Sequence, residues 1–77
     1  MDTPLVQFQP NQTGIVAHLN LPEDSLRRVA AFGLHPGSRF SLKRIAPMGG
    51  PLLLEVGATR FLLRRSLAKQ IWVRMEA

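Results

Sequence analysis

The side chains best suited to catalysis or metal binding are two histidines, His18 and His35, and they stand apart in the chain. Neither histidine has a carboxylate at a useful spacing, and the chain contains no cysteine, so no catalytic nucleophile with a positioned general base is evident. Divalent metal ions favour groups of imidazole and carboxylate ligands, yet His35 has no second ligand three or four residues away. We therefore expect no enzyme activity, no cofactor and no metal centre. A weak surface site that pairs a histidine with Glu23 or Asp24 is the alternative.

Phosphate binding would need a glycine-rich loop or a basic surface. Gly49-Gly50 lies between two prolines with neither a following lysine nor a following helix, so we expect no nucleotide site. Ten basic residues against five acidic ones give a net charge of +5. Several of them could form a nucleic-acid stripe: Lys43, Arg44, Arg60, Arg64, Arg65, Lys69 and Arg74. The stacking aromatics of single-strand binders are missing apart from Trp72 and one phenylalanine, which argues against nucleic acid and favours solvated strand faces.

The length of the chain limits how such residues can be positioned. Seventy-seven residues predict one domain, 1–77, in which residues 1–12 form an N-terminal lead-in. The apolar runs fall far short of the roughly 20 residues that cross a bilayer, so we expect no direct membrane insertion. The first residues contain an acid and lead into no apolar stretch, which predicts no secretory signal and a cytoplasmic protein.

Proline and glycine divide the chain into short segments that predict a mainly β fold, a small barrel of about five strands with one short helix between the first and second strands. A β-branched run predicts a strand over 13–19, and alternating apolar residues predict strands over 39–44, 52–56 and 71–75. A turn at Gly57-Ala58 leads into a strand over 60–64, which forms a hairpin with 52–56. Helical spacing after Pro22 predicts the helix, and residues 66–70 form a short connector. We expect Gly33, Gly37 and Gly57 to form turns. The expected core is Leu26, Val29, Phe40, Leu42, Leu54, Val56, Phe61, Leu63, Ile71 and Val73.

Four sequence blocks in this order resemble the FeoA family. They are Thr13-Gly14-Ile15-Val16, the run from Leu26 to Gly37, the loop Ala46-Pro47-Met48-Gly49-Gly50-Pro51, and the closing run from Leu63 to Val73. The same module resembles the C-terminal domain of DtxR-type metal-dependent repressors. Two positions depart from the family pattern, since the family usually has an acidic residue at Gly50 and a glutamate at Leu67.

The resemblance implies an SH3-like β-barrel and a non-catalytic accessory role in ferrous-iron transport. It also implies a partner, the cytosolic GTPase part of the membrane iron transporter FeoB. Two other functions stay open at this point: a small basic barrel that binds nucleic acid, and a detached repressor-type domain that binds protein. Because a fold does not carry a function by itself, the connection with iron depends on the resemblance alone.

The expected docking surface for a protein partner is the loop Pro47-Met48-Gly49-Gly50-Pro51 together with Leu34 and Pro36 on the helix-to-strand turn. A loop with a proline at each end loses little entropy on binding, and an exposed methionine offers an adaptable apolar contact. Lys43 and Arg44 would steer an acidic partner toward it. The alternative is an ordinary strand connection with Met48 folded over the end of the barrel.

Overall fold

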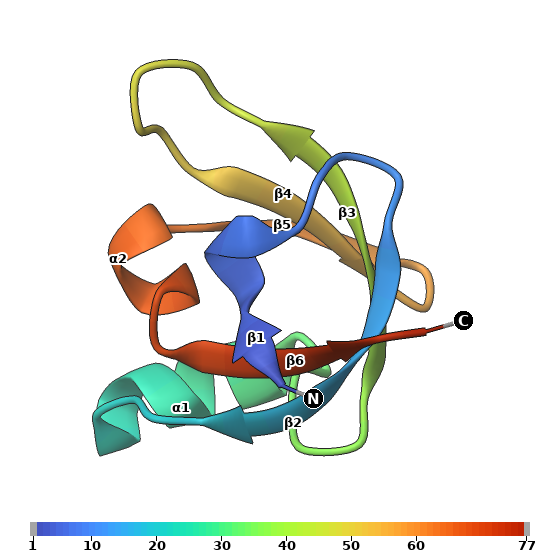
Figure 1. The fold of residues 1–77 in the computed structure, drawn as a ribbon. Helices are drawn as coiled ribbons and strands as arrows, with labels where there is room; N and C mark the ends of the chain where they lie inside the picture. The colour runs from blue at the N-terminus through green and yellow to red at the C-terminus, as the bar shows by residue number, and fades with distance from the viewer. Residues whose placement is uncertain (1, 77) are drawn as a thin grey trace.

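Six antiparallel strands form a single sheet in the computed structural model, which describes residues 2–76 (Figure 1). The strand order is β1-β6-β2-β3-β4-β5. The strands are β1 (Thr3–Pro4), β2 (Thr13–Leu19), β3 (Arg39–Ile45), β4 (Leu52–Val56), β5 (Thr59–Leu63) and β6 (Ile71–Met75). A 3-10 turn, η1 (Leu5–Gln7), and two helices, α1 (Glu23–Ala31) and α2 (Arg65–Ala68), complete the chain.

The sheet curls around one core in the manner of an SH3-like fold, with α1 beneath it and α2 at one side (Figure 1). Irregularities in the pairing bend it at two places, between Val16 and His18 in β2 and between Leu42 and Arg44 in β3. Within residues 2–76, β1 and β5 stand at opposite ends of the strand order and do not pair, so hydrogen bonds do not close the barrel. The predicted mainly β architecture is confirmed, with the two-residue β1 as an additional strand.

The helix α1 begins and ends where the sequence predicted. Pro22 precedes its first turn, Glu23 and Asp24 lie at its positive end, and Val29 is its buried residue. Gly33 follows the helix with φ 95°, and Gly37 has φ 90° in the next turn, so both predicted turn glycines adopt the left-handed region. In residues 2–76, no helix has the length and apolar character needed to span a membrane.

A β-hairpin joins β4 to β5 through Gly57-Ala58. Val56 pairs with Thr59, which leaves two residues in the loop, and Gly57 has φ 60° at the first of them. A glycine at this position suits a type II′ turn, whose twist matches that of the flanking strands. Gly57 is thus a turn residue, as predicted.

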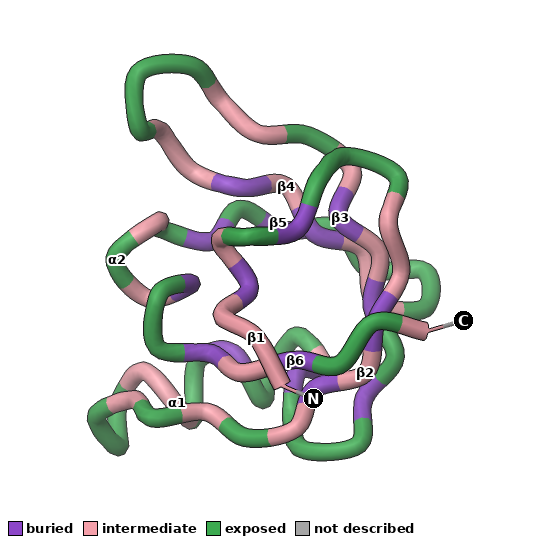
Figure 2. The backbone as a smooth tube through the Cα atoms, viewed as in Figure 1, coloured by how far each residue is buried: buried purple, intermediate pink, exposed green. Residues whose placement is uncertain are grey.

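The buried residues include most of the predicted core and extend it toward the N-terminus (Figure 2). Eight of the ten expected residues are buried, while Val56 packs partly buried against the core and Leu26 is only half-buried. Six further hydrophobic residues are buried: Leu5, Phe8, Val16, Leu34, Leu52 and Ala68. Within the N-terminal lead-in, Leu5 and Phe8 are 1% and 3% exposed, so this segment contributes to the core.

Gly14 explains how the N-terminal segment reaches the core. A Cβ atom at this position would lie 2.8 Å from the Phe8 ring and 2.8 Å from the carbonyl oxygen of Arg74. The absence of a side chain in β2 lets the Phe8 ring pack onto the sheet, where it contacts Phe40 at 5.4 Å between ring centroids.

Candidate functional site

The loop between β3 and β4 projects beyond the body of the molecule (Figure 1). The amide of Ala46 donates to the carbonyl of Pro51 at 3.0 Å, and the amide of Gly50 donates to the carbonyl of Pro47 at 3.1 Å. The two residues between, Met48 and Gly49, have φ of 59° and 73°. Two consecutive positive φ values inside a turn that is closed by the hydrogen bond from Gly50 to Pro47 identify a type I′ turn.

Met48 adopts a backbone conformation in this turn that is unfavourable for most residues with a side chain. Type I′ turns usually place asparagine, aspartate or glycine at this position, because a β-carbon crowds the backbone when φ is positive. The Met48 side chain is nevertheless 103% exposed, so no packing contact offsets the strain. The alternative in which Met48 folds over the end of the barrel is wrong, since the side chain points into solvent.

Gly50 lies close to Ala46 and Pro47 in the same loop and has no space for a side chain. A Cβ atom here would lie 2.7 Å from the Cβ of Ala46 and 3.2 Å from the carbonyl oxygen of Pro47. A larger residue at position 50 would therefore force the loop to shift. Because position 50 is a glycine rather than an acidic residue, the two ends of the loop can approach each other closely.

The structure does not bring the two parts of the expected docking surface together. Leu34 is 1% exposed and belongs to the core, where its amide donates to the carbonyl of Val29 at 3.0 Å. Pro36 is exposed, but its turn lies at the opposite end of β3 from the Met48 loop (Figure 2). The buried Ser38 fixes this turn, because its hydroxyl accepts the amide of His35 at 3.0 Å and donates to the carbonyl of Gly33 at 2.7 Å.

The expected steering residues Lys43 and Arg44 differ in their surroundings. Lys43 lies 3.5 Å from the carboxylate of Glu55, which also accepts a 2.8 Å hydrogen bond from Arg60. The hydrogen bond from Arg60 and the charge of Lys43 lower the pKa of the Glu55 carboxyl below its ordinary value. Arg44 is exposed and has no ion-pair partner within residues 2–76, so its charge is the more available of the two.

An open cavity of about 500 Å³ separates the Met48 loop from the start of α2. It is lined by Gly49, Gly50, Pro51, Arg64, Arg65 and Ser66. The Nε of Arg65 is buried here without a hydrogen-bond partner, and it lies about 4.0 Å from where a Cβ of Gly49 would be. We call the Pro47–Pro51 loop and Arg64–Ser66 together the loop surface. Sequence reasoning placed Arg64 and Arg65 in a general basic stripe and missed that they flank this loop.

A separate groove, which we call the β5 groove, runs between α1 and β5. Eight residues line it: Arg28, Val29, Phe32, Phe61, Leu62, Leu63, Arg64 and Leu67. Phe32 and Phe61 stack at 4.7 Å between ring centroids, although Phe32 is 39% exposed and Leu62 is 68% exposed. Arg64 lines both the β5 groove and the cavity beside the Met48 loop.

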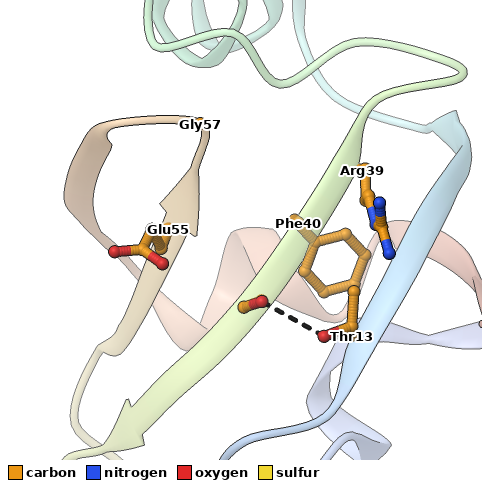
Figure 3. A pocket seen from close by; sticks show the side chains of 6 residues that line it. Thr13, Arg39, Phe40, Glu55 and Gly57 are labelled. Atoms are coloured by element: carbon orange, nitrogen blue, oxygen red, sulfur yellow. Dashed lines mark hydrogen bonds between the residues drawn. The ribbon is translucent and has the colours of Figure 1, made fainter.

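A third opening of about 400 Å³ lies over β2, β3 and β4 (Figure 3). Its polar groups already have partners within the protein. The hydroxyls of Thr13 and Ser41 are 3.2 Å apart, Arg39 pairs with Glu76 at 2.8 Å, and Glu55 is held by Arg60 and Lys43. With its donors and acceptors satisfied, this opening offers little to a polar ligand.

The two histidines make different local contacts. The His18 ring stacks on Trp72 at 5.9 Å between centroids, and Nδ1 of His35 lies 3.3 Å from the carbonyl oxygen of Pro36. In the part of the chain that the structure describes, no three histidine, cysteine or carboxylate side chains gather where they could hold a metal ion. The His18 ring occupies one face of the ring of Trp72, the only tryptophan in the sequence.

Comparison with known proteins gives the family of the chain. Residues 3–75 match the FeoA domain. No match was found among curated proteins. The crystal structure of an iron uptake regulatory protein (FeoA) superposes with a TM-score of 0.84 at 30% identity, over 99% of each chain.

Two further solved structures share the fold. A FeoA protein from Chlorobium tepidum has a TM-score of 0.92 at 24% identity, over 97% of this chain and 71% of that one. A manganese-dependent transcriptional repressor has a TM-score of 0.86 at 22% identity, over 97% of this chain and 42% of the repressor. The match to the FeoA domain over almost the whole sequence shows that this chain belongs to the FeoA family.

Proposed function

We propose that this chain is a non-catalytic accessory protein of ferrous-iron transport, which acts in the cytoplasm by docking on the cytosolic GTPase part of a FeoB-like membrane transporter. Membership of the FeoA family and the likeness to an iron uptake regulatory protein support the connection with iron. The observation that carries the docking role is Met48, a fully exposed apolar side chain on a strained turn.

The geometry of the Met48 loop suits protein binding. Its ends are tied by the 3.0 Å hydrogen bond from Ala46 to Pro51, and its tip by the 3.1 Å bond from Gly50 to Pro47. A loop held in one conformation before binding loses little entropy when it binds. The thioether side chain of Met48 adapts to an irregular apolar surface. Strain at an exposed position that stabilises nothing within the domain is typical of a functional contact.

The charges around the loop favour an acidic partner surface. Arg44, Arg64 and Arg65 have no ion-pair partner in residues 2–76, and the chain as a whole carries a net charge of +5. Complementary charge raises the rate of association more than it strengthens the final complex. These arginines would therefore steer the partner, while Met48 and its neighbours supply the contact.

Calorimetry with the purified cytosolic domain of the transporter tests the proposal. Met48→Asp should abolish binding and leave the fold intact, because aspartate tolerates a positive φ and the position is exposed. Met75→Asp is the matched control, since Met75 is 54% exposed at the end of β6, and it should bind as the wild type does. Lys43→Ala combined with Arg44→Ala should mainly reduce the association rate and its dependence on salt. Normal binding by Met48→Asp would exclude the loop as the docking surface.

A further inference from the structure

The β5 groove combines apolar walls with arginines that have no partner. Phe32, Phe61 and Leu62 form the apolar part, and its cavity of about 90 Å³ has room for one side chain rather than a whole ligand. Arg28 on α1 and Arg64 after β5 line the same groove, and neither makes an ion pair within residues 2–76. No acidic residue lines it. The groove is therefore complementary to an apolar side chain that has carboxylates near it.

The position of β5 adds a second argument. Side chains of a strand alternate between its two faces, so a groove lined by the consecutive residues 61–64 follows the edge of the strand. Among the strands of residues 2–76, β5 is the last in the sheet order, which leaves main-chain groups of this edge without a neighbouring strand. An extended peptide can bond to such an edge through its own main chain.

We propose that the β5 groove binds an extended segment of a protein partner in which one aliphatic or aromatic residue is flanked on both sides by acidic residues. The apolar side chain enters the cavity beside Phe32 and Leu62, and the flanking carboxylates meet Arg28 and Arg64. Bidentate geometry makes arginine well suited to carboxylates. A second copy of this chain is a poor occupant, because each copy carries a net charge of +5 and the copies repel each other.

This inference goes beyond the proposed function, because it specifies a binding motif that does not depend on which protein carries it. Selection from a random peptide library displayed on phage, with the whole chain as bait, tests it directly. We expect the enriched peptides to share an apolar residue between acidic residues. Enrichment of peptides without that pattern, or no enrichment at all, would overturn the proposal. A dimer in sedimentation that Leu62→Ser abolishes would also overturn it, since the groove would then bind a second copy.

Charge reversal then locates the bound peptide. Arg28→Glu and Arg64→Glu should each lower the affinity for the enriched peptide by about three- to tenfold in a fluorescence titration, since each substitution replaces an exposed charge attraction by repulsion. Leu62→Ser should lower this affinity by about tenfold, because an apolar contact is lost. Arg27→Glu is the matched control, because Arg27 neighbours Arg28 on α1 but does not line the groove.

The four substituted side chains are solvent-facing, and a thermal midpoint near that of the wild type verifies that each variant folds. The groove would be refuted as the binding site if the enriched peptide bound equally well to the Arg27→Glu, Arg28→Glu and Arg64→Glu variants. The selection uses no transporter, so a failed transporter interaction and a failed groove are separate results.

Discussion

Met48→Asn should make the domain more stable. A left-handed conformation costs a residue with a β-carbon about 1–2 kcal/mol, and asparagine is among the few residues that adopt it readily. The substitution removes no buried contact, because the Met48 side chain is 103% exposed. We expect the free energy of unfolding to rise by about 0.5–1 kcal/mol, which for a domain of this size raises Tm by about 2–8 °C. The resulting Asn-Gly pair is the preferred sequence of a type I′ turn.

Thermal unfolding followed by circular dichroism measures the effect, and Met48→Gln is the matched control. Glutamine is as polar as asparagine, but it lacks the short side chain that supports a positive φ, so its Tm should stay near that of the wild type. Both variants should lose affinity for the partner, because both remove the apolar contact. An asparagine variant no more stable than the glutamine variant would refute the claim that the turn is strained.

Three further outcomes test the core and the electrostatics. Leu54→Ala should lower the free energy of unfolding by about 2–5 kcal/mol in urea, because Leu54 is 0% exposed; an unchanged midpoint would contradict the register of β4. Phe8→Ala should cost about 3–5 kcal/mol, whereas no change would mean that the N-terminal segment does not pack. The lowered pKa of Glu55 stabilises the fold above the ordinary value near 4.5, and this contribution disappears as the pH falls through the lowered pKa. The Tm values of the wild type and Glu55→Gln should thus differ at neutral pH and converge in acid, and a constant difference would contradict this assignment.

Local patterns in the sequence were sufficient for most of the secondary structure. Alternation of Phe40 and Leu42 with Ser41 and Lys43 predicted β3, and helical spacing around Val29 predicted α1. These predictions succeed because the periodicity of a strand or a helix is a property of neighbouring residues, and a buried face imposes it directly. The loop between β3 and β4 was also predicted, since its prolines and glycines exclude a continuous strand, but the sequence does not decide whether Met48 is exposed.

The N-terminal segment shows what local patterns leave out. Its strand β1 has two residues and its 3-10 turn has three, so neither is long enough to display a period. Phe8 is buried because Gly14 in β2 leaves space for its ring. The two segments meet only once β2 has paired with β3 and β6 in the sheet. Burial of this kind depends on the shape of the assembled sheet rather than on spacing along the chain.

The same distinction applies to the candidate surfaces. Sequence alone identified the residue types that a docking protein would use, namely a methionine in a loop with a proline at each end and an excess of arginine. Only the tertiary structure showed that Leu34 is buried and that Arg64 and Arg65 lie beside the Met48 loop. It also joined Phe32 of the segment after α1 to Phe61 and Leu62 of β5 across one groove. The sequence thus determined the five longer strands and the helix α1 through the periodicity of neighbouring residues. The packing of distant segments decided which further residues are buried and which exposed residues share a surface.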